Sequence, residues 1–180
     1  MMTPLFLLLA VATAVRLPAG TPAAREKARL CQELNGEESI AACRAALALG
    51  LGPERAEAVD QILASRLASL DRWGELVELY RSLAQLRPAD ASAQYHLGSA
   101  LLLAGGRAEE SLAPLREAAR LQPEASPPRV LLGVALNALG RYDEAVAAFE
   151  EALRFDPTAL DGLPAARATF EASQRQERWP

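Results

Sequence analysis

The 180-residue chain has few aromatic side chains, a single lysine and a single histidine. Aromatic residues make up 5% of it, and its apolar 51% consists mostly of alanine and leucine. Alanine and leucine favour helices, whereas β-branched and aromatic residues favour strands. The composition therefore argues against a β-rich fold and predicts closely packed helices, in a chain long enough for one domain of ordinary size.

The residues that most often carry catalysis are scarce. A nucleophile usually needs a neighbouring base, which is most often histidine, and the chain contains only His96. No phosphate-binding glycine loop, metal-spaced cluster or nucleophile elbow is present. The net charge of −4 and the lack of basic runs argue against nucleic acid as a ligand. We therefore expect no enzyme, cofactor, metal site or small-molecule substrate.

The apolar run at residues 5–15 is too short to span a bilayer, which takes about 20 residues. It has the length of the hydrophobic region of a secretory signal, and Ala12 and Ala14 form a small-residue cleavage pattern. No lysine or arginine precedes the run. We expect a signal peptide over 1–14, cleaved near Ala14, a linker over 15–24, and export to a bacterial periplasm. An uncleaved N-terminal membrane anchor is the alternative.

Two cysteines, Cys31 and Cys43, flank the turn signal Asn35-Gly36, with alanine-rich helical sequence on both sides. Residues equidistant from the turn of an antiparallel helix pair face each other, so the two thiols are expected at matching heights. Export would make a disulfide chemically allowed. We expect a degenerate helical hairpin over 25–52 joined by this disulfide. Two buried thiols in a reduced protein are the alternative.

A repeat of about 34 residues runs through the rest of the chain. Prolines at positions 88, 123 and 157 close three similar segments, at spacings of 35 and 34 residues. Self-similarity at such a period is typical of helical repeat proteins. A large residue lies eight positions before each proline, namely Tyr80, Leu115 and Phe149.

These segments resemble the tetratricopeptide repeat family. Its unit has Leu-Gly and a large residue in the first helix, an aromatic residue between two alanines in the second, and a closing proline. Residues 126–157 match with Leu132, Gly133, Leu136, Ala145, Phe149, Ala152 and Pro157. Only Arg129 departs, at the first large position. The cysteine hairpin resembles a further, degenerate copy, in which Cys43 takes the place of Phe149.

The resemblance implies an all-α fold, a right-handed superhelical stack of antiparallel helix pairs. It places three repeats within residues 53–157, namely 57–90, 91–125 and 126–157. One pair cannot bury its own apolar face, so the copies must stack. Residues 158–180 are expected to form a capping helix and a frayed tail. Pro114, inside the second helix of the middle copy, predicts a kink or a late helix start.

In this family the first helices of the repeats line a concave groove that contacts the ligand. The resemblance places ten residues along it: Gln61, Ser65, Ser69, Tyr95, His96, Ser99, Leu102, Val130, Val134 and Asn137. This face is almost uncharged, and it lacks the basic clamp with which some cytosolic members hold an acidic peptide end. A mildly apolar, hydroxyl-lined groove suits a helix or an extended hydrophobic segment.

Together these features predict a non-catalytic interaction scaffold that binds a peptide or helix of an envelope protein. The sequence does not identify that partner. The alternative is a structural or oligomerisation subunit, including a homodimer, whose groove is filled by the protein itself. Such a subunit would belong to an envelope assembly for secretion, pili, the outer membrane or cytochrome maturation.

Overall fold

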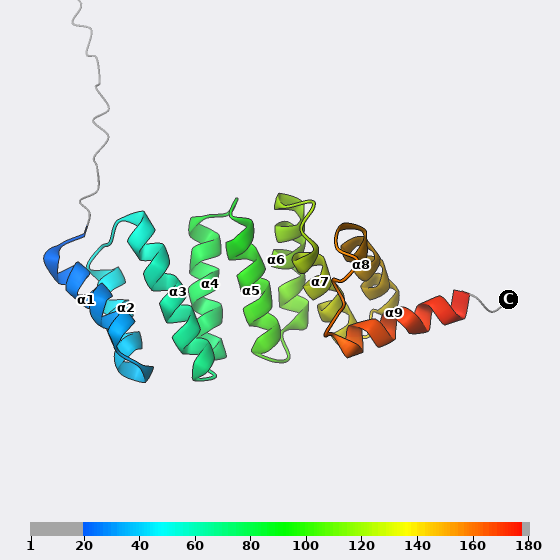
Figure 1. Cartoon of the computed structure of the whole chain (residues 1–180), viewed down its shortest axis with the longest axis horizontal. Coiled ribbons are helices and arrows are strands. Elements are labelled where there is room, and N and C mark those ends of the chain that lie inside the picture. The colour runs from blue at the N-terminus through cyan, green and yellow to red at the C-terminus, as the bar shows by residue number, and fades with distance from the viewer. Residues whose placement is uncertain (1–19, 178–180) are drawn as a thin grey trace, which may run out of the picture. The chain divides into compact units, whose positions relative to one another are not determined.

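The computed structural model describes residues 20–177, with the side chains of residues 20–173 (Figure 1). These residues form helices joined by short turns, and no strand occurs among them. The predicted all-α fold, a succession of helix pairs, is thus confirmed. The expected signal peptide over 1–14 and residues 15–19 of the expected linker lie outside the described residues. No helix in the described part is long and apolar enough to cross a membrane.

Within residues 20–177 the chain forms nine helices, which follow one another along the sequence. They are α1 (Pro22–Glu33), α2 (Gly36–Ala48), α3 (Pro53–Ser69), α4 (Trp73–Leu86), α5 (Ala91–Leu103), α6 (Ala108–Leu121), α7 (Ser126–Ala138), α8 (Tyr142–Phe155) and α9 (Pro164–Glu177). The chain divides into two compact units within α3. The N-terminal unit ends at Leu63, and the C-terminal unit begins at Ala64.

In the N-terminal unit, α1 and α2 pack against each other as a hairpin. Pro22 opens α1 and the Thr21 hydroxyl accepts a hydrogen bond from the Ala24 amide at 3.1 Å, which caps the helix. Gly36, at the start of α2, has a φ of +56°, a conformation that glycine adopts without strain. The short turn at this glycine therefore brings α2 back along α1.

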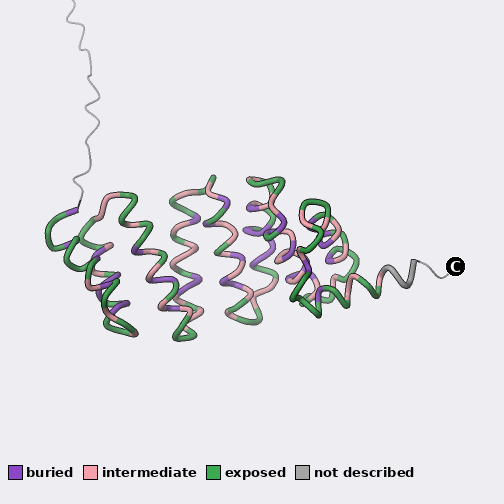
Figure 2. The backbone as a smooth tube through the Cα atoms, viewed as in Figure 1, coloured by how far each residue is buried: buried purple, intermediate pink, exposed green. Residues whose placement is uncertain are grey.

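In the C-terminal unit, α5 packs on α6, α7 packs on α8, and α6 and α7 join the two pairs. The core is built around Leu112, Leu115, Leu136 and Phe149, all at most 3% exposed. In Figure 2 the buried residues of this unit concentrate in α5 to α8, whereas exposed residues dominate α9. The core therefore lies between the helices of successive pairs.

The Leu-Gly pattern of the sequence marks close helix contacts in this core. A Cβ atom added at Gly98 would lie 2.5 Å from Leu115 Cγ. One added at Gly133 would lie 2.3 Å from Phe149 Cε1. Each glycine thus leaves the space that the large side chain of the next helix fills, and this pairing sets how closely the two helices approach.

Pro114 does not delay the start of its helix. We expected a kink or a late start, but α6 begins at Ala108, six residues earlier, so the late start is wrong. Proline removes one helical hydrogen bond, the one to the Glu110 carbonyl. The turn before it is held by the Ser111 hydroxyl, which donates to the Ala108 carbonyl at 2.7 Å. Pro114 is itself buried with Leu115, so packing offsets the lost bond.

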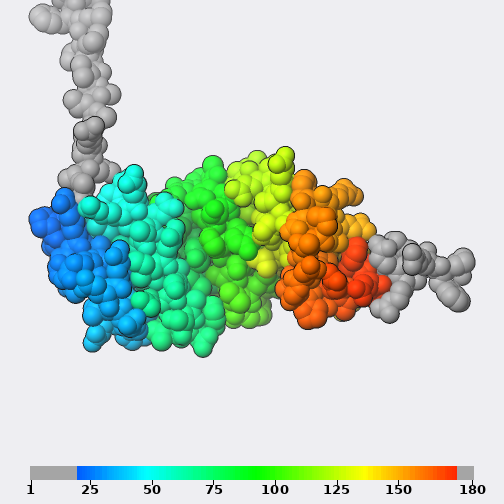
Figure 3. Space-filling view, in the orientation of Figure 1, coloured from blue at the N-terminus to red at the C-terminus, as the bar shows by residue number. Residues whose placement is uncertain are grey.

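The last helix, α9, covers one end of the C-terminal unit. It packs against α8 and α7, and Ala166 is buried while Phe170 is half-buried against the core. The space-filling view shows α9 in contact with α8 (Figure 3). The far end of α9 extends past α8 (Figure 1). Only the first half of this helix therefore takes part in the core.

Candidate functional site

The predicted groove residues divide between the two units. Gln61 belongs to the N-terminal unit, and the other nine belong to the C-terminal unit. Ser65 and Ser69 are exposed on the last turns of α3. The Ser69 hydroxyl donates to the Arg66 carbonyl of its own helix at 2.8 Å. All three residues lie on α3.

The remaining predicted residues lie on α5 and α7, which contact each other. We define the α5–α7 face by seven residues: Tyr95, His96, Ser99 and Leu102 of α5, and Leu131, Val134 and Asn137 of α7. Spacings of three and four residues place the members from each helix along one side of it. The face therefore spans two successive repeats.

Half-buried apolar side chains form the floor of the α5–α7 face. Tyr95, Leu102, Leu131 and Val134 pack against the core and keep part of their surface. Val130, which we predicted for the groove, is 7% exposed and belongs to the core, so it offers a ligand little surface. Leu131 was not among the predicted groove residues. Neighbouring helix residues point about 100° apart, and the sequence alone does not decide whether Val130 or Leu131 faces the surface.

An aromatic cluster covers one end of the face. The His96 ring stacks on Tyr80 of α4, with centroids 5.1 Å apart, and meets the edge of Tyr95 at 5.3 Å. Burial lowers the pKa of His96, and the Asp90 carboxylate opposes that shift in part. The imidazole is therefore favoured in its neutral form. The contact of Tyr80 with His96 was not predicted, because the repeat pattern assigned Tyr80 only to packing within its own helix pair.

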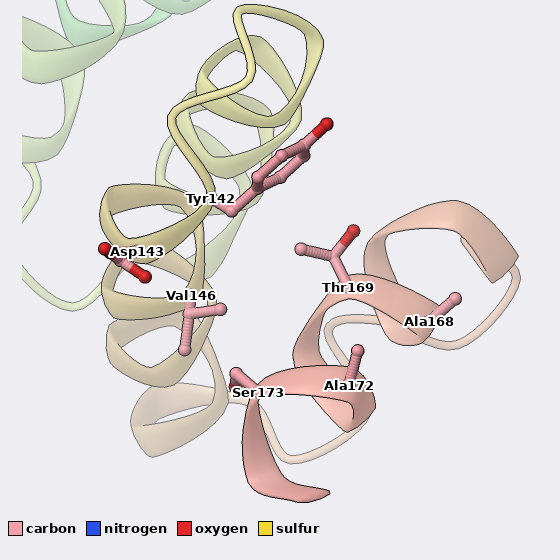
Figure 4. Close-up of a pocket in the computed structure, with 7 residues that line it drawn as sticks. All are labelled: Tyr142, Asp143, Val146, Ala168, Thr169, Ala172 and Ser173. Atoms are coloured by element: carbon pink, nitrogen blue, oxygen red, sulfur yellow. The ribbon is translucent and has the colours of Figure 1, made fainter. Parts of the chain in front are cut away.

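At the other end, α9 engages the face. The Thr169 hydroxyl donates to Asn137 Oδ1 at 2.9 Å. Figure 4 shows that Thr169 also borders a pocket between α8 and α9. The pocket has a volume of about 480 Å³, and it is lined by Tyr142, Asp143, Val146, Ala168, Thr169, Ala172 and Ser173. Neither the contact to Asn137 nor this pocket was predicted.

Charge is nearly absent from the helices that form the face. α5 contains no charged residue, and α7 contains only Arg129. The Arg129 side chain is 11% exposed, lies 3.3 Å from the Glu151 carboxylate, and covers the Phe155 ring at 4.8 Å. Its charge is therefore compensated by α8, so the surface of α5 and α7 presents no free charge to a ligand.

The charged residues lie instead on the second helices of the pairs. Glu110 pairs with Arg107 at 2.6 Å and with Arg81 of α4 at 3.6 Å. Arg141 pairs with Glu144 at 2.7 Å. Hydrogen bonds from these arginines lower the pKa values of Glu110 and Glu144. The pairs are exposed, so each contributes little to stability, but they give these helices a hydrated surface.

In the N-terminal unit the structure brings the two cysteines together. The sulfur atoms of Cys31 and Cys43 lie 2.03 Å apart and their Cα atoms 4.7 Å apart. Both side chains are fully buried. The buried Ser39 hydroxyl donates to the Cys31 carbonyl at 2.7 Å. The predicted juxtaposition of the two thiols is therefore present.

Comparison with known proteins points to one repeat family. Residues 130–159, on α7, α8 and the turn after them, match the family model described as tetratricopeptide repeat. No curated protein matches the chain. The family match falls on the copy in which the Leu-Gly and aromatic positions are most complete.

Several solved structures share the fold. A crystal structure of the MamA protein is 16% identical, with a TM-score of 0.69 and coverage of 86% of this chain and 85% of its own. MamA from Desulfovibrio magneticus RS-1 is 20% identical, with a TM-score of 0.66 and coverage of 89% and 98%. YrrB, described as a TPR protein with an unusual peptide-binding site, is 18% identical, with a TM-score of 0.60 and coverage of 73% and 64%. The family match therefore identifies one tetratricopeptide repeat at residues 130–159, and the succession of helix pairs gives the chain the fold of TPR proteins.

Proposed function

We propose that this protein is a non-catalytic scaffold that binds a peptide or helix of a protein partner on the α5–α7 face. The observation that carries the proposal is the separation of charge in the C-terminal unit. α5 and α7 present half-buried apolar side chains and no free charge, while α6 and α8 carry the exposed ion pairs. A face of this kind favours an uncharged, apolar segment.

The chemistry of the face supports contact with a peptide. Tyr95, Leu102 and Val134 offer apolar surface that a partner would bury, and tyrosine is enriched at such interfaces. Ser99 and the neutral His96 ring supply hydrogen-bonding groups without a charge to desolvate. YrrB, which shares the fold, is itself described as having a peptide-binding site, in keeping with a protein ligand here.

We further propose that the protein is exported, in a bacterium to the periplasm, and that its partner belongs to the cell envelope. The apolar run at residues 5–15 supports export, and oxidation of Cys31 and Cys43 would follow from the oxidising compartment. Thiol titration of exported protein, without reductant, tests the pairing. No reactive thiol is expected in the unfolded chain, and two would contradict the proposal.

A self-filled groove is the second candidate, and one observation favours it. α9 already bonds Asn137, at one end of the α5–α7 face, through Thr169. An element that covered the rest of the face would make the protein a structural or oligomerisation subunit of an envelope assembly. Within the described residues α9 contacts α7 and α8 but not α5, which carries Tyr95 and Leu102. It therefore covers only the Asn137 end of the face.

A substitution pair tests the binding face. Tyr95→Glu with Val134→Glu would place two carboxylates on the apolar floor, and recovery of the envelope partner by affinity capture should be lost. The matched control is Ala113→Glu with Ala147→Glu, which adds the same charges at exposed positions of α6 and α8. The control should recover the partner like the wild type. Unchanged recovery by a folded face variant would refute the assignment of the site.

A further inference from the structure

The contact between α1 and α2 is built almost entirely of small side chains. Its buried residues are Ala24, Ala28 and Cys31 of α1, and Ser39, Ile40, Ala42, Cys43 and Ala46 of α2. Ile40 is the one large apolar side chain among them. Because hydrophobic stabilisation scales with buried apolar area, and alanine buries a single methyl group, this contact is weak in apolar terms.

The pair α7 and α8 shows what the hairpin lacks. There Phe149 and Leu136 are at most 2% exposed, and the Phe149 ring fills the space beside Gly133. In the repeat pattern Cys43 stands where Phe149 stands. The two sulfur atoms of the hairpin therefore occupy the place that a large ring fills in the complete repeat.

The side of α1 that faces α3 is only partly covered. A pocket of about 280 Å³ lies between α1 and α3, bordered by Ala28 of α1 and by Ala58 and Val59 of α3. Across the hairpin, the Ser39 hydroxyl bonds the Cys31 carbonyl. The hairpin is thus joined through small apolar side chains, this hydrogen bond and the sulfur pair, and the pocket leaves part of α1 uncovered on its α3 side.

We propose that the α1–α2 hairpin is a redox-sensitive element, in which reduction of the Cys31–Cys43 bond releases α1 while the C-terminal unit stays folded. The reductant is a dithiol. It supplies two electrons and two protons, the S–S bond breaks, two thiols form, and the dithiol closes to its own disulfide. The inference rests on the oxidised state in the proposed function. The reason is that the apolar contact between α1 and α2 is too small to hold the two helices together once the cross-link is broken.

A single lysine makes the release of α1 measurable. Lys27 is the only lysine in the chain, and it lies within α1. A lysine-specific endoprotease cuts there only when the helix opens locally. We expect cleavage of the full mature protein to be at least tenfold faster after treatment with dithiothreitol than before it. Arginine-specific cleavage beyond Ala64, mapped by mass spectrometry, should stay as slow as in the untreated protein.

The double variant Cys31→Ala with Cys43→Ala supplies the control. It should be cut rapidly at Lys27, and dithiothreitol should not change its rate, which separates the bond from other effects of the reductant. If the variant fails to fold, the cleavage rates of reduced and untreated wild type at Lys27 still test the inference. Equal rates for reduced and untreated wild type would overturn the inference, as would loss of protection throughout the C-terminal unit on reduction. Partner capture by the α5–α7 face is measured separately, so either proposal can fail alone.

Discussion

At the scale of single residues, two glycines explain why the repeat pairs Leu-Gly with a large residue on the next helix. Gly98 and Gly133 lie where any Cβ atom would enter the side chain of Leu115 or Phe149. The repeat therefore requires glycine for close packing, and the large residue is required to fill the space. The pair can be read from sequence because both members recur at a fixed spacing.

Substituting one of these glycines should cost stability. Gly133→Ala places a methyl group 2.3 Å from Phe149 Cε1. Overpacking of this kind costs about 1–3 kcal/mol, and the better helix propensity of alanine returns about 1 kcal/mol. We expect a net loss of up to about 2 kcal/mol, measured by urea unfolding. The control is Gly74→Ala in α4, where nothing lies within 4 Å of the added Cβ. It should be neutral or stabilising, and an equal loss there would contradict the packing explanation.

His96 should make stability depend weakly on pH. Burial beside Tyr80 and Tyr95 lowers its pKa below the ordinary 6.5. Between the two pKa values the unfolded state binds more protons, so stability rises with pH there. The contribution of neutral His96 to the free energy of unfolding is fully present above pH 6.5 and is lost as pH falls through the lowered pKa. Urea midpoints at a series of pH values should show this loss in wild type and a smaller one in His96→Gln. An equal dependence of the urea midpoint on pH in wild type and variant would contradict the role of His96.

At the scale of elements, α9 differs from the helices it follows. α5 and α7 are each covered by a partner helix of their own pair, whereas α9 packs on the core through the buried Ala166 and the half-buried Phe170 and bonds Asn137 through Thr169. A pocket also separates part of α9 from α8. We therefore expect α9 to open more readily than α5 to α8, as elements with few buried contacts do.

Removing the Thr169 hydroxyl should loosen α9 further. A hydrogen bond of this type contributes about 0.5–1.5 kcal/mol, so Thr169→Val should speed amide hydrogen exchange in α9 by roughly two- to tenfold. Exchange in α5 and α6 should not change. Thr169→Ser keeps a hydroxyl and serves as the control. If the valine variant exchanges like the wild type, the bond to Asn137 does not hold α9 in place.

At the scale of the whole molecule, the two candidate functions predict different behaviour without a partner. A scaffold with an open α5–α7 face should sediment as a monomer at micromolar concentration. A homodimer that closed this face would instead support the oligomerisation subunit, and Val134→Glu should then dissociate it. Analytical ultracentrifugation of the mature chain, wild type and variant, distinguishes these outcomes. A dimer unaffected by the variant would place its interface elsewhere.

The sequence alone determined the helical fold, the repeat period, the Leu-Gly and aromatic positions, and the juxtaposition of Cys31 with Cys43. Each depends on spacing along one helix or across one short turn, which the periodicity of the chain encodes. At Pro114 packing decided instead, because burial in the core maintained a helix that proline disfavours.

Only the tertiary structure decided which residues of α5 and α7 keep exposed surface. It placed Val130 in the core and Leu131 on the face, because the rotation of each helix is set by packing against its neighbours. It also brought Tyr80 to His96, and Thr169 to Asn137 across 32 residues of sequence. Such contacts join different helices, and no local pattern encodes them. The exposed surface of the α5–α7 face therefore depends on how its helices pack.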